Sequence, residues 1–328
     1  MTRHPPPPLL RTALTADGAL SLAVPADARR LVDGWLPHHL ALSDAAERLA
    51  ADRPAAASIV AHGDVHEMPV AAGDAAATFG PVAVRASSGR LALDTATTAR
   101  GDVDLAARRA TLVGDPAAPD DVAAVHAMLT VAAAALLGRL ARALVHAAAV
   151  VDPEGRAWLL VGDTHAGKST TCATLLEAGW RYTSDDHVVL SADGDAGVRA
   201  EGWPRVLHLD RGWTDGRPAG GERAAVDALA RWPGRWQPAA PVGGVLLPSV
   251  DADAPTRLGP ASPAERLAML VRQAPWLFVD ATAAPAMLAL LQRTALLPGA
   301  ALRLGRDTFR RPDRLQAVLA PLLRDGAV

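Results

Sequence analysis

The sequence predicts an α/β fold over residues 116–328, preceded by a smaller α+β domain, rich in β-strands, over residues 1–115. Two observations predict this division. In the second part, apolar runs of strand length alternate with helical patterns, which is typical of a sheet covered by helices. In the first part, short apolar or alternating runs lie between Gly, Ser and Asp residues, which favours a small β-rich domain.

The charge and cysteine content exclude several classes of protein. Lys and Arg number 33 against 35 Asp and Glu, a formal net charge of −2, so no overall positive field attracts nucleic acid. Cys172 is the only cysteine, which leaves no partner for an intramolecular disulfide. The most apolar stretch, 122–137, is mostly alanine and falls short of a membrane span. We therefore expect a cytoplasmic protein with neither a nucleic-acid nor a membrane partner.

Short helices and strands are predicted for the first part of the chain. Residues 26–51 predict one or two short helices broken near Pro37. The apolar positions that would line them are Leu31, Leu36, Leu40 and Leu49. Strands are predicted over 58–62, 81–86, 90–95 and 109–113.

A turn-rich connector, 114–119, separates the two parts. After it, Asp120 or Asp121 is expected to cap a long Ala- and Leu-rich helix that runs to about Val145. His146 would then lie at the end of this helix, just before the next strand.

The second part continues as strand, turn, strand, loop and helix. Strands are predicted over 147–151 and 157–161, with a turn between them at 153–155. A glycine-rich loop follows the second strand, and after it a helix is predicted over 168–178, with Gly179 as its C-cap. Two further strands, 180–184 and 187–191, flank Asp185-Asp186. The remaining elements expected are a strand at 242–247, helices at 263–273, 285–296 and 311–323, and a long loop or excursion at 217–238.

The segment Gly162-Asp-Thr-His-Ala-Gly167-Lys168-Ser169 has the Walker A spacing and lies between an apolar strand and a helix, as that motif requires. Its backbone N–H groups and helix N-terminus suit phosphate oxygens, Lys168 suits the β- and γ-phosphates, and the Ser169 hydroxyl suits Mg²⁺. The loop therefore predicts ATP and Mg²⁺, the alternative being a glycine turn with an incidental lysine. The nucleotide-binding candidates are Gly162, Asp163, Thr164, His165, Ala166, Gly167, Lys168, Ser169 and Thr170.

Lys168 is the only lysine, and arginine occupies every other Lys/Arg position. This bias is typical of GC-rich coding pressure, under which a lysine that serves only as a positive charge drifts to arginine. The surviving lysine therefore indicates a place where a planar guanidinium does not fit.

Asp185-Asp186 ends the strand that follows the helix of the loop, and strand ends on this side surround the ligand crevice of an α/β sheet. One carboxylate can bind Mg²⁺ or its water, and the other can accept a proton from an attacking hydroxyl. Which of the two is the base stays open, and the alternative for the pair is a solvated turn.

Two histidines near the loop have two readings each. His165 stands where many such loops have glycine, and a positive φ is one conformation that it could adopt there. Its side chain either contacts the γ-phosphate or the acceptor, or it faces solvent. His146 is either structural or part of the site.

Four of the eight tryptophans fall within one short stretch of the chain. Base stacking is one role for them, and packing or a partner surface is the favoured one. These residues are Trp203, Trp213, Trp232 and Trp236.

The segment from His146 through the loop to Asp185-Asp186 resembles the HPr serine kinase/phosphorylase family. The shared features are a histidine before a hairpin, the phosphate-binding loop, a glycine that ends its helix, and the paired aspartates. The resemblance is good over 140–192, weaker over 203–209 and faint at 301–305, and it does not cover the first part of the chain.

The resemblance implies a P-loop kinase core of the type related to phosphoenolpyruvate carboxykinase, which transfers the γ-phosphoryl group of ATP to a seryl hydroxyl with Mg²⁺. Carried onto this chain, it puts the nucleotide and the metal at Lys168 and Ser169 and places His146 near the phosphate. The catalytic candidates are Asp185, Asp186, His146 and Lys168, and the metal candidates are Ser169 and Asp185.

The chain departs from the family at two points. Thr164 and His165 stand where glycine and serine are common inside the loop, and the Glu-x-Arg-Gly signature of the bifunctional members has no clear equivalent. These departures argue against phosphorylase activity and are similar to those of divergent relatives that modify ribosomal peptides.

The leading hypothesis is a kinase for a serine hydroxyl of a peptide or protein, and self-association into a homo-oligomer is compatible with it. A kinase for a small-molecule alcohol is the second hypothesis. A third, from a different class, is an ATP-binding regulatory subunit with slow hydrolysis.

Overall fold

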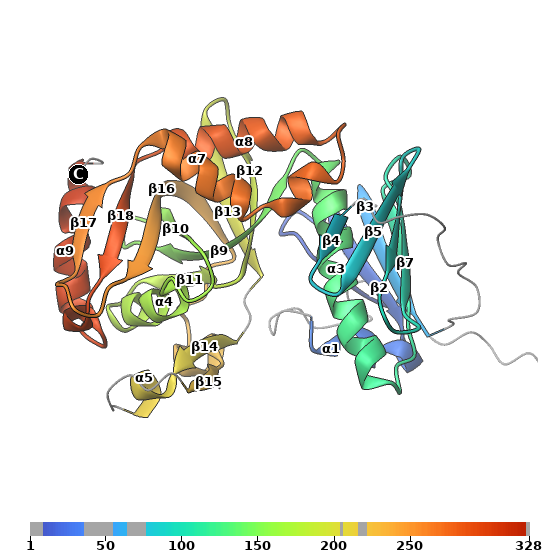
Figure 1. The fold of residues 1–328 in the computed structure, drawn as a ribbon, viewed down its shortest axis with the longest axis horizontal. Helices are drawn as coiled ribbons and strands as arrows, with labels where there is room; N and C mark the ends of the chain where they lie inside the picture. The colour runs from blue at the N-terminus through green and yellow to red at the C-terminus, as the bar shows by residue number, and fades with distance from the viewer. Residues whose placement is uncertain (1–8, 36–54, 64–76, 204–205, 216–221, 326–328) are drawn as a thin grey trace, which may run out of the picture. The chain divides into compact units, whose positions relative to one another are not determined.

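The computed structural model describes residues 9–35, 55–63, 77–203, 206–215 and 222–325 (Figure 1). The chain forms two compact units, and each is described by itself. Unit 1 comprises Met1–Ala141 with Phe278–Ala284, and unit 2 comprises Arg142–Leu277 with Pro285–Val328. Both units combine helices with β-sheet, so the chain is a mixed α/β protein with several sheets.

Unit 1 is built on a sheet with the strand order β1-β2-β3-β8-β7-β6-β5-β4. β3 pairs in parallel with β2 and β8, and the other neighbours are antiparallel. The strands are β1 Leu9–Ala13, β2 Leu20–Pro25, β3 Ala57–His62, β4 Ala77–Phe79, β5 Val82–Ser87, β6 Arg90–Asp94, β7 Arg100–Asp104 and β8 Arg109–Val113. The predicted strands correspond to β3, β5, β6 and β8, and the prediction missed β1, β2, β4 and β7.

Short helical turns follow β2. They are η1, Ala26–Ala28, and α1, Arg30–Asp33, where Leu31 and Val32 are buried. The rest of the predicted helical stretch, with Leu36, Leu40 and Leu49, lies outside the described residues.

Helix α3, Pro119–Gly138, packs on β3 and β8 and beside α1. It is long and apolar enough to cross a membrane by length and composition, with a mean hydropathy of 1.7, and 72% of that window is buried inside the structure. A core helix of a soluble protein has the same character. The alanines of this helix allow its backbone to approach the sheet closely, because they carry no side chain beyond Cβ.

The ends of α3 differ from the prediction. The helix stops at Gly138 rather than near Val145, and its N-cap is Ala118 with Pro119 in the first turn. Asp121 is not a cap; its buried carboxylate accepts hydrogen bonds from Thr98 N at 3.1 Å and Thr98 Oγ1 at 2.6 Å, and so holds α3 to the turn before β7. α3 belongs to unit 1, whereas the sequence pattern placed it in the second domain.

Unit 2 is built on a sheet in which β10, β9, β12, β13 and β16 pair in turn and β16 returns to β10, so that these strands close a ring. β18 and β17 extend the sheet beyond β16, and β11 pairs with β9. The bounds are β9 Ala143–Val151, β10 Ala157–Val161, β11 Arg181–Ser184, β12 His187–Asp193, β13 Gly197–Trp203, β16 Ala239–Val250, β17 Arg257–Pro260 and β18 Gly299–Leu304. The predicted strands correspond to β9 to β12 and β16.

The helices of unit 2 follow the predicted positions closely. Helix α7 begins with a capping box, in which Ser262 and Glu265 exchange hydrogen bonds. The helices are α4 Lys168–Glu177, α7 Pro263–Arg272, α8 Ala284–Leu296 and α9 Pro312–Asp325, with short 3₁₀ turns η3 Pro275–Phe278 and η4 Arg306–Thr308. α4 packs between the sheet and α9, and the buried Cys172 is part of this core.

The tryptophan-rich stretch folds against α4 (Figure 1). Its elements are β14 Leu207–Asp210, α5 Arg211–Asp215, β15 Arg223–Val226 and α6 Ala228–Arg231, so the stretch 217–238, predicted as a long loop or excursion, contains a short strand and a short helix in its described part. Trp203, Trp213 and Trp232 are buried and Trp236 is half-buried. Packing, not base stacking, is the role that their burial indicates.

Candidate phosphate loop and paired carboxylates

The loop between β10 and α4 has the geometry that its glycines require. Gly167 is the N-cap of α4 and has a left-handed backbone, φ 96°, which favours glycine. A Cβ at this position would lie 2.6 Å from Leu304 Cδ1. A Cβ at Gly162 would lie 3.3 Å from the carbonyl oxygen of Pro248. The strand, loop and helix expected around the Walker A spacing are all present.

His165 lies at the exposed tip of the loop, and its φ of 68° confirms the positive φ considered from the sequence. Its Nδ1 atom is 2.7 Å from a guanidinium nitrogen of Arg223 on β15. Because a guanidinium only donates, this contact requires His165 Nδ1 to be the acceptor. Thr164 is also exposed, and Ala166 and Thr170 are half-buried.

Lys168 is buried at the start of α4, where only 7% of the residue is exposed. Its Nζ donates to the carbonyl oxygens of Gly162 at 2.8 Å and Asp163 at 3.0 Å. Burial lowers the pKa of Lys168, and the negative charges of nearby aspartates, led by Asp186, oppose that effect. The Lys168 ammonium therefore donates to carbonyl oxygens of its own loop, and it interacts electrostatically with Asp185 and Asp186.

The C-terminal end of α7 holds the loop from the other side. Gln273 Nε2 donates to Asp163 Oδ1 at 3.1 Å, and an Arg272 guanidinium nitrogen lies 3.2 Å from Asp163 Oδ2. The backbone oxygen of Gln273 accepts from the backbone N–H of His146 at 2.8 Å. One residue after α7 therefore contacts both the loop and the strand that carries His146.

Asp185 accepts hydrogen bonds from two hydroxyl groups. Ser169 Oγ donates to its Oδ2 at 3.2 Å, and Tyr182 Oη donates to its Oδ1 at 3.1 Å. The aspartate is buried. Ser169 and Asp185, the two metal candidates, are thus in contact.

Asp186 lies between two imidazoles. Its Oδ1 is 2.9 Å from His146 Nδ1, and its Oδ2 is 2.6 Å from His187 Nδ1. Burial by itself raises the pKa of Asp186, but the charge of His187 and the hydrogen bonds from both histidines more than offset it, so the pKa is well below its ordinary value. Asp186 is therefore ionised at neutral pH.

Strand pairing positions the two histidines. His146 lies within β9, opposite His187 on β12, and not at the end of a helix as predicted. The ring of His187 is 6.4 Å from that of Trp203 and 6.5 Å from that of Trp276. His187, Tyr182, Gln273 and Arg223 were not identified from the sequence. Of these, only His187 carried a local signal, because it directly follows the aspartate pair.

The loop and the aspartates offer a partial set of ligands for Mg²⁺. Among the residues that the structure describes, no group of three or more His, Cys, Asp or Glu side chains is arranged to hold a metal ion. Mg²⁺ does not need such a cage, because it keeps several waters and takes substrate phosphate oxygens beside one or two carboxylates. Ser169 Oγ and Asp185 Oδ2 are oxygen ligands of that kind.

Comparisons with known proteins return little. No protein-family model matches the chain, and no curated protein matches it. A solved structure, that of the Hpr(Ser) kinase/phosphatase from Coxiella burnetii, matches with 16% sequence identity and a TM-score of 0.24, over 35% of this chain and 70% of that chain. A TM-score at this level does not establish a shared fold.

Proposed function

We propose that the chain is an ATP-dependent phosphotransferase that transfers the γ-phosphoryl group to a hydroxyl, first of all a serine hydroxyl of a peptide or protein, with Mg²⁺. The observation that supports it most is that the two carboxylates beside the loop are held differently. Asp185 contacts Ser169, and Asp186 contacts two imidazoles. The choice of serine rests on the sequence resemblance over 140–192.

The loop supplies the phosphate contacts. Its backbone N–H groups and the N-terminus of α4 favour negative charge. Lys168 Nζ, which now donates to Gly162 and Asp163, would exchange those carbonyl oxygens for oxygens of the β- and γ-phosphates. A compact ammonium makes this exchange by rotation of its last side-chain bonds.

Ser169 and Asp185 would hold Mg²⁺. When bound there, the ion neutralises charge on the β- and γ-phosphates. Its arrival would replace the Ser169–Asp185 hydrogen bond, because both oxygens would turn to the metal.

Asp186 would receive the proton of the acceptor. The acceptor oxygen forms a bond to the γ-phosphorus, the bond from that phosphorus to the β–γ bridging oxygen breaks, and ADP leaves. The hydroxyl proton moves to a carboxylate oxygen of Asp186, whose two oxygens contact the imidazoles of His146 and His187. The lowered pKa makes Asp186 a weak base, which suits a loose transition state governed by orientation and charge.

The test is to incubate the purified chain with Mg·ATP and the peptides or proteins encoded beside its gene. Transfer to serine adds about 80 Da, the mass of one phosphoryl group, to the acceptor. Lys168→Ala is the inactive control. Phosphorylation of a free alcohol with no peptide product would support the small-molecule kinase. Bound ATP with no transfer would support the regulatory subunit, and absence of ATP binding would contradict the proposal altogether.

A further inference from the structure

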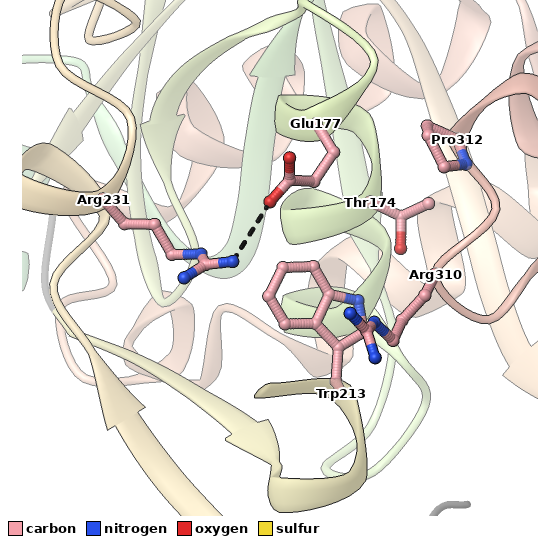
Figure 2. Close-up of a pocket in the computed structure, with 6 residues that line it drawn as sticks. All are labelled: Thr174, Glu177, Trp213, Arg231, Arg310 and Pro312. Atoms are coloured by element: carbon pink, nitrogen blue, oxygen red, sulfur yellow. Dashed lines mark hydrogen bonds and ion pairs between the residues drawn. The ribbon is translucent and has the colours of Figure 1, made fainter. Parts of the chain in front are cut away.

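A pocket lies in unit 2, on the C-terminal half of α4 (Figure 2). Its volume is about 340 Å³, which is in the lower range for small-molecule sites. The lining residues are Thr174, Glu177, Trp213, Arg231, Arg310 and Pro312. None of the phosphate-loop or aspartate residues lines it, so it is a separate place on the same helix.

Two hydrogen-bond donors at this pocket have no acceptor in the described part of the chain. Trp213 is 2% exposed, and its Nε1 has no partner there. A buried N–H without an acceptor costs free energy, so native proteins rarely leave one. Arg310 is exposed, and its guanidinium forms no hydrogen bond or ion pair with any described residue. Arg310 also has a left-handed backbone, φ 56°, which is uncommon for a residue other than glycine.

Arg231 is already held in place at the pocket. Its guanidinium is 3.4 Å from Glu177 Oε1 and 5.5 Å from the ring centre of Trp213. In Figure 2, Arg231 and Arg310 approach from opposite sides of the view, with Glu177 and Trp213 between them. An anion in this pocket would meet one arginine, Arg231, whose side chain needs little further ordering.

The charges of the lining residues select the anion. Two guanidiniums and one carboxylate leave the pocket one positive charge, which a single negative charge balances. A phosphomonoester brings about −1.5 to −2 and would add repulsion from Glu177. A carboxylate brings one charge and fits the planar fork of an arginine. Trp213 and Pro312 line the pocket, so the rest of such a molecule would contact Pro312 and the small part of the indole that is not covered.

We propose that this pocket binds a small monocarboxylate with an aromatic or apolar body. The carboxylate accepts hydrogen bonds from the guanidinium of Arg310 and from Trp213 Nε1, and Arg231 adds its charge. The body lies against Trp213 and Pro312. The proposal does not depend on the phosphotransferase activity, because the pocket shares no residue with the phosphate loop.

The test uses phenylacetate as the probe, titrated into the full chain by calorimetry in buffer without Mg²⁺ or nucleotide. We expect a dissociation constant of about 1 mM or tighter, and at least about tenfold weaker binding in Arg310→Gln, because a hydrogen bond to a charged group is lost. Arg311→Gln is the matched control, since Arg311 is the exposed neighbour that does not line the pocket. Phenylacetamide, which keeps the body and removes the charge, should bind at least about tenfold more weakly than phenylacetate.

Further measurements locate the binding. Lys168→Ala should bind phenylacetate as the unchanged chain does, whatever its effect on ATP; loss of binding in this variant would place the anion at the phosphate loop and overturn the proposal. Arg231→Gln, checked for native packing by near-ultraviolet circular dichroism, should also bind more weakly. No binding by the unchanged chain, equal binding of phenylacetamide, or equal affinity of Arg310→Gln and Arg311→Gln would each overturn it.

Discussion

Asp185 and Asp186 are consecutive in the chain, yet their carboxylates lie among different kinds of donor. Asp185 meets neutral hydroxyls, those of Ser169 and Tyr182, at 3.2 and 3.1 Å. Asp186 meets the imidazoles of His146 and His187 at 2.9 and 2.6 Å. Hydroxyl partners rotate away readily when a cation arrives, whereas imidazoles carry and exchange protons near neutral pH. Two adjacent residues of one type thus lie in two different hydrogen-bonding environments, which is the basis for the two different roles proposed for them.

The most direct test of the difference between Asp185 and Asp186 is to remove the charge of each carboxylate in turn. We expect Asp186→Asn to lower kcat by about 10²–10⁴-fold with little change in the KM for Mg·ATP, because the proton acceptor is lost. Asp185→Asn should instead raise the Mg²⁺ concentration needed for half-maximal activity. Steady-state kinetics at several Mg²⁺ concentrations separate the two. Asp193→Asn, an exposed aspartate on β12, is the control, and identical kinetic defects in both site variants would contradict the division.

Lys168 interacts electrostatically with both aspartates of the pair. Burial lowers the pKa of Lys168, and the negative charges of Asp186 and Asp185 oppose that effect. Lys168→Arg should lower kcat/KM by about 10²–10³-fold, because a guanidinium is too large to take the place of an ammonium at the loop carbonyls. The measurement is turnover with ATP, with Arg199→Ala on the exposed face of β13 as the control. Full activity in Lys168→Arg would remove the loop from the mechanism.

The contact between Asp186 and His187 predicts a change in the pH dependence of activity when His187 is replaced. His187 is the largest of the influences that lower the pKa of Asp186, so His187→Gln should raise that pKa. If Asp186 acts as the ionised base, activity falls as pH drops through its pKa, and the acid limb of kcat/KM should move to higher pH in the variant. His208→Gln, an exposed histidine on β14, should leave the limb unchanged. An unmoved acid limb in His187→Gln would argue that another group is the base.

The smallest effect is expected from substitutions of the hydroxyl groups that donate to Asp185. Tyr182→Phe removes a hydroxyl that donates to Asp185 and leaves a buried carboxylate oxygen with less hydrogen bonding, so we expect a loss of about 1–3 kcal/mol in the free energy of unfolding. Its Mg²⁺ dependence should stay near that of the unchanged chain. Ser169→Ala should show the reverse, with altered Mg²⁺ dependence and little change in stability. Denaturant unfolding and kinetics of the pair provide the check.

The loop, its helix and the aspartate pair could be predicted from the sequence because their signals are local. Glycines at fixed spacing, an apolar strand before them and a helical pattern after them are enough to place Lys168, Ser169 and Asp185. The strands and helices around them follow from periodicity and from breakers in the same way. What the site does with these residues stays a prediction.

The position of His146 was predicted wrongly, because the alanine- and leucine-rich pattern resumes after the break before it. Gly138, the last residue of α3, was the local signal for that break, and the chain then turns through Ala141, whose φ is 54°. A left-handed alanine is unfavourable by itself, so local propensity does not predict this turn. The pairing of His146 with His187 also depends on strand register between residues far apart in the chain.

Gln273 has a consequence for how the chain can vary among relatives. Its side chain contacts Asp163, whereas its backbone oxygen contacts the backbone N–H of His146. A substitution at position 273 changes the first contact but keeps the second, because every residue has a carbonyl group. In diverging relatives, positions 163 and 273 should therefore change together, whereas position 146 should be constrained by the residue at position 186.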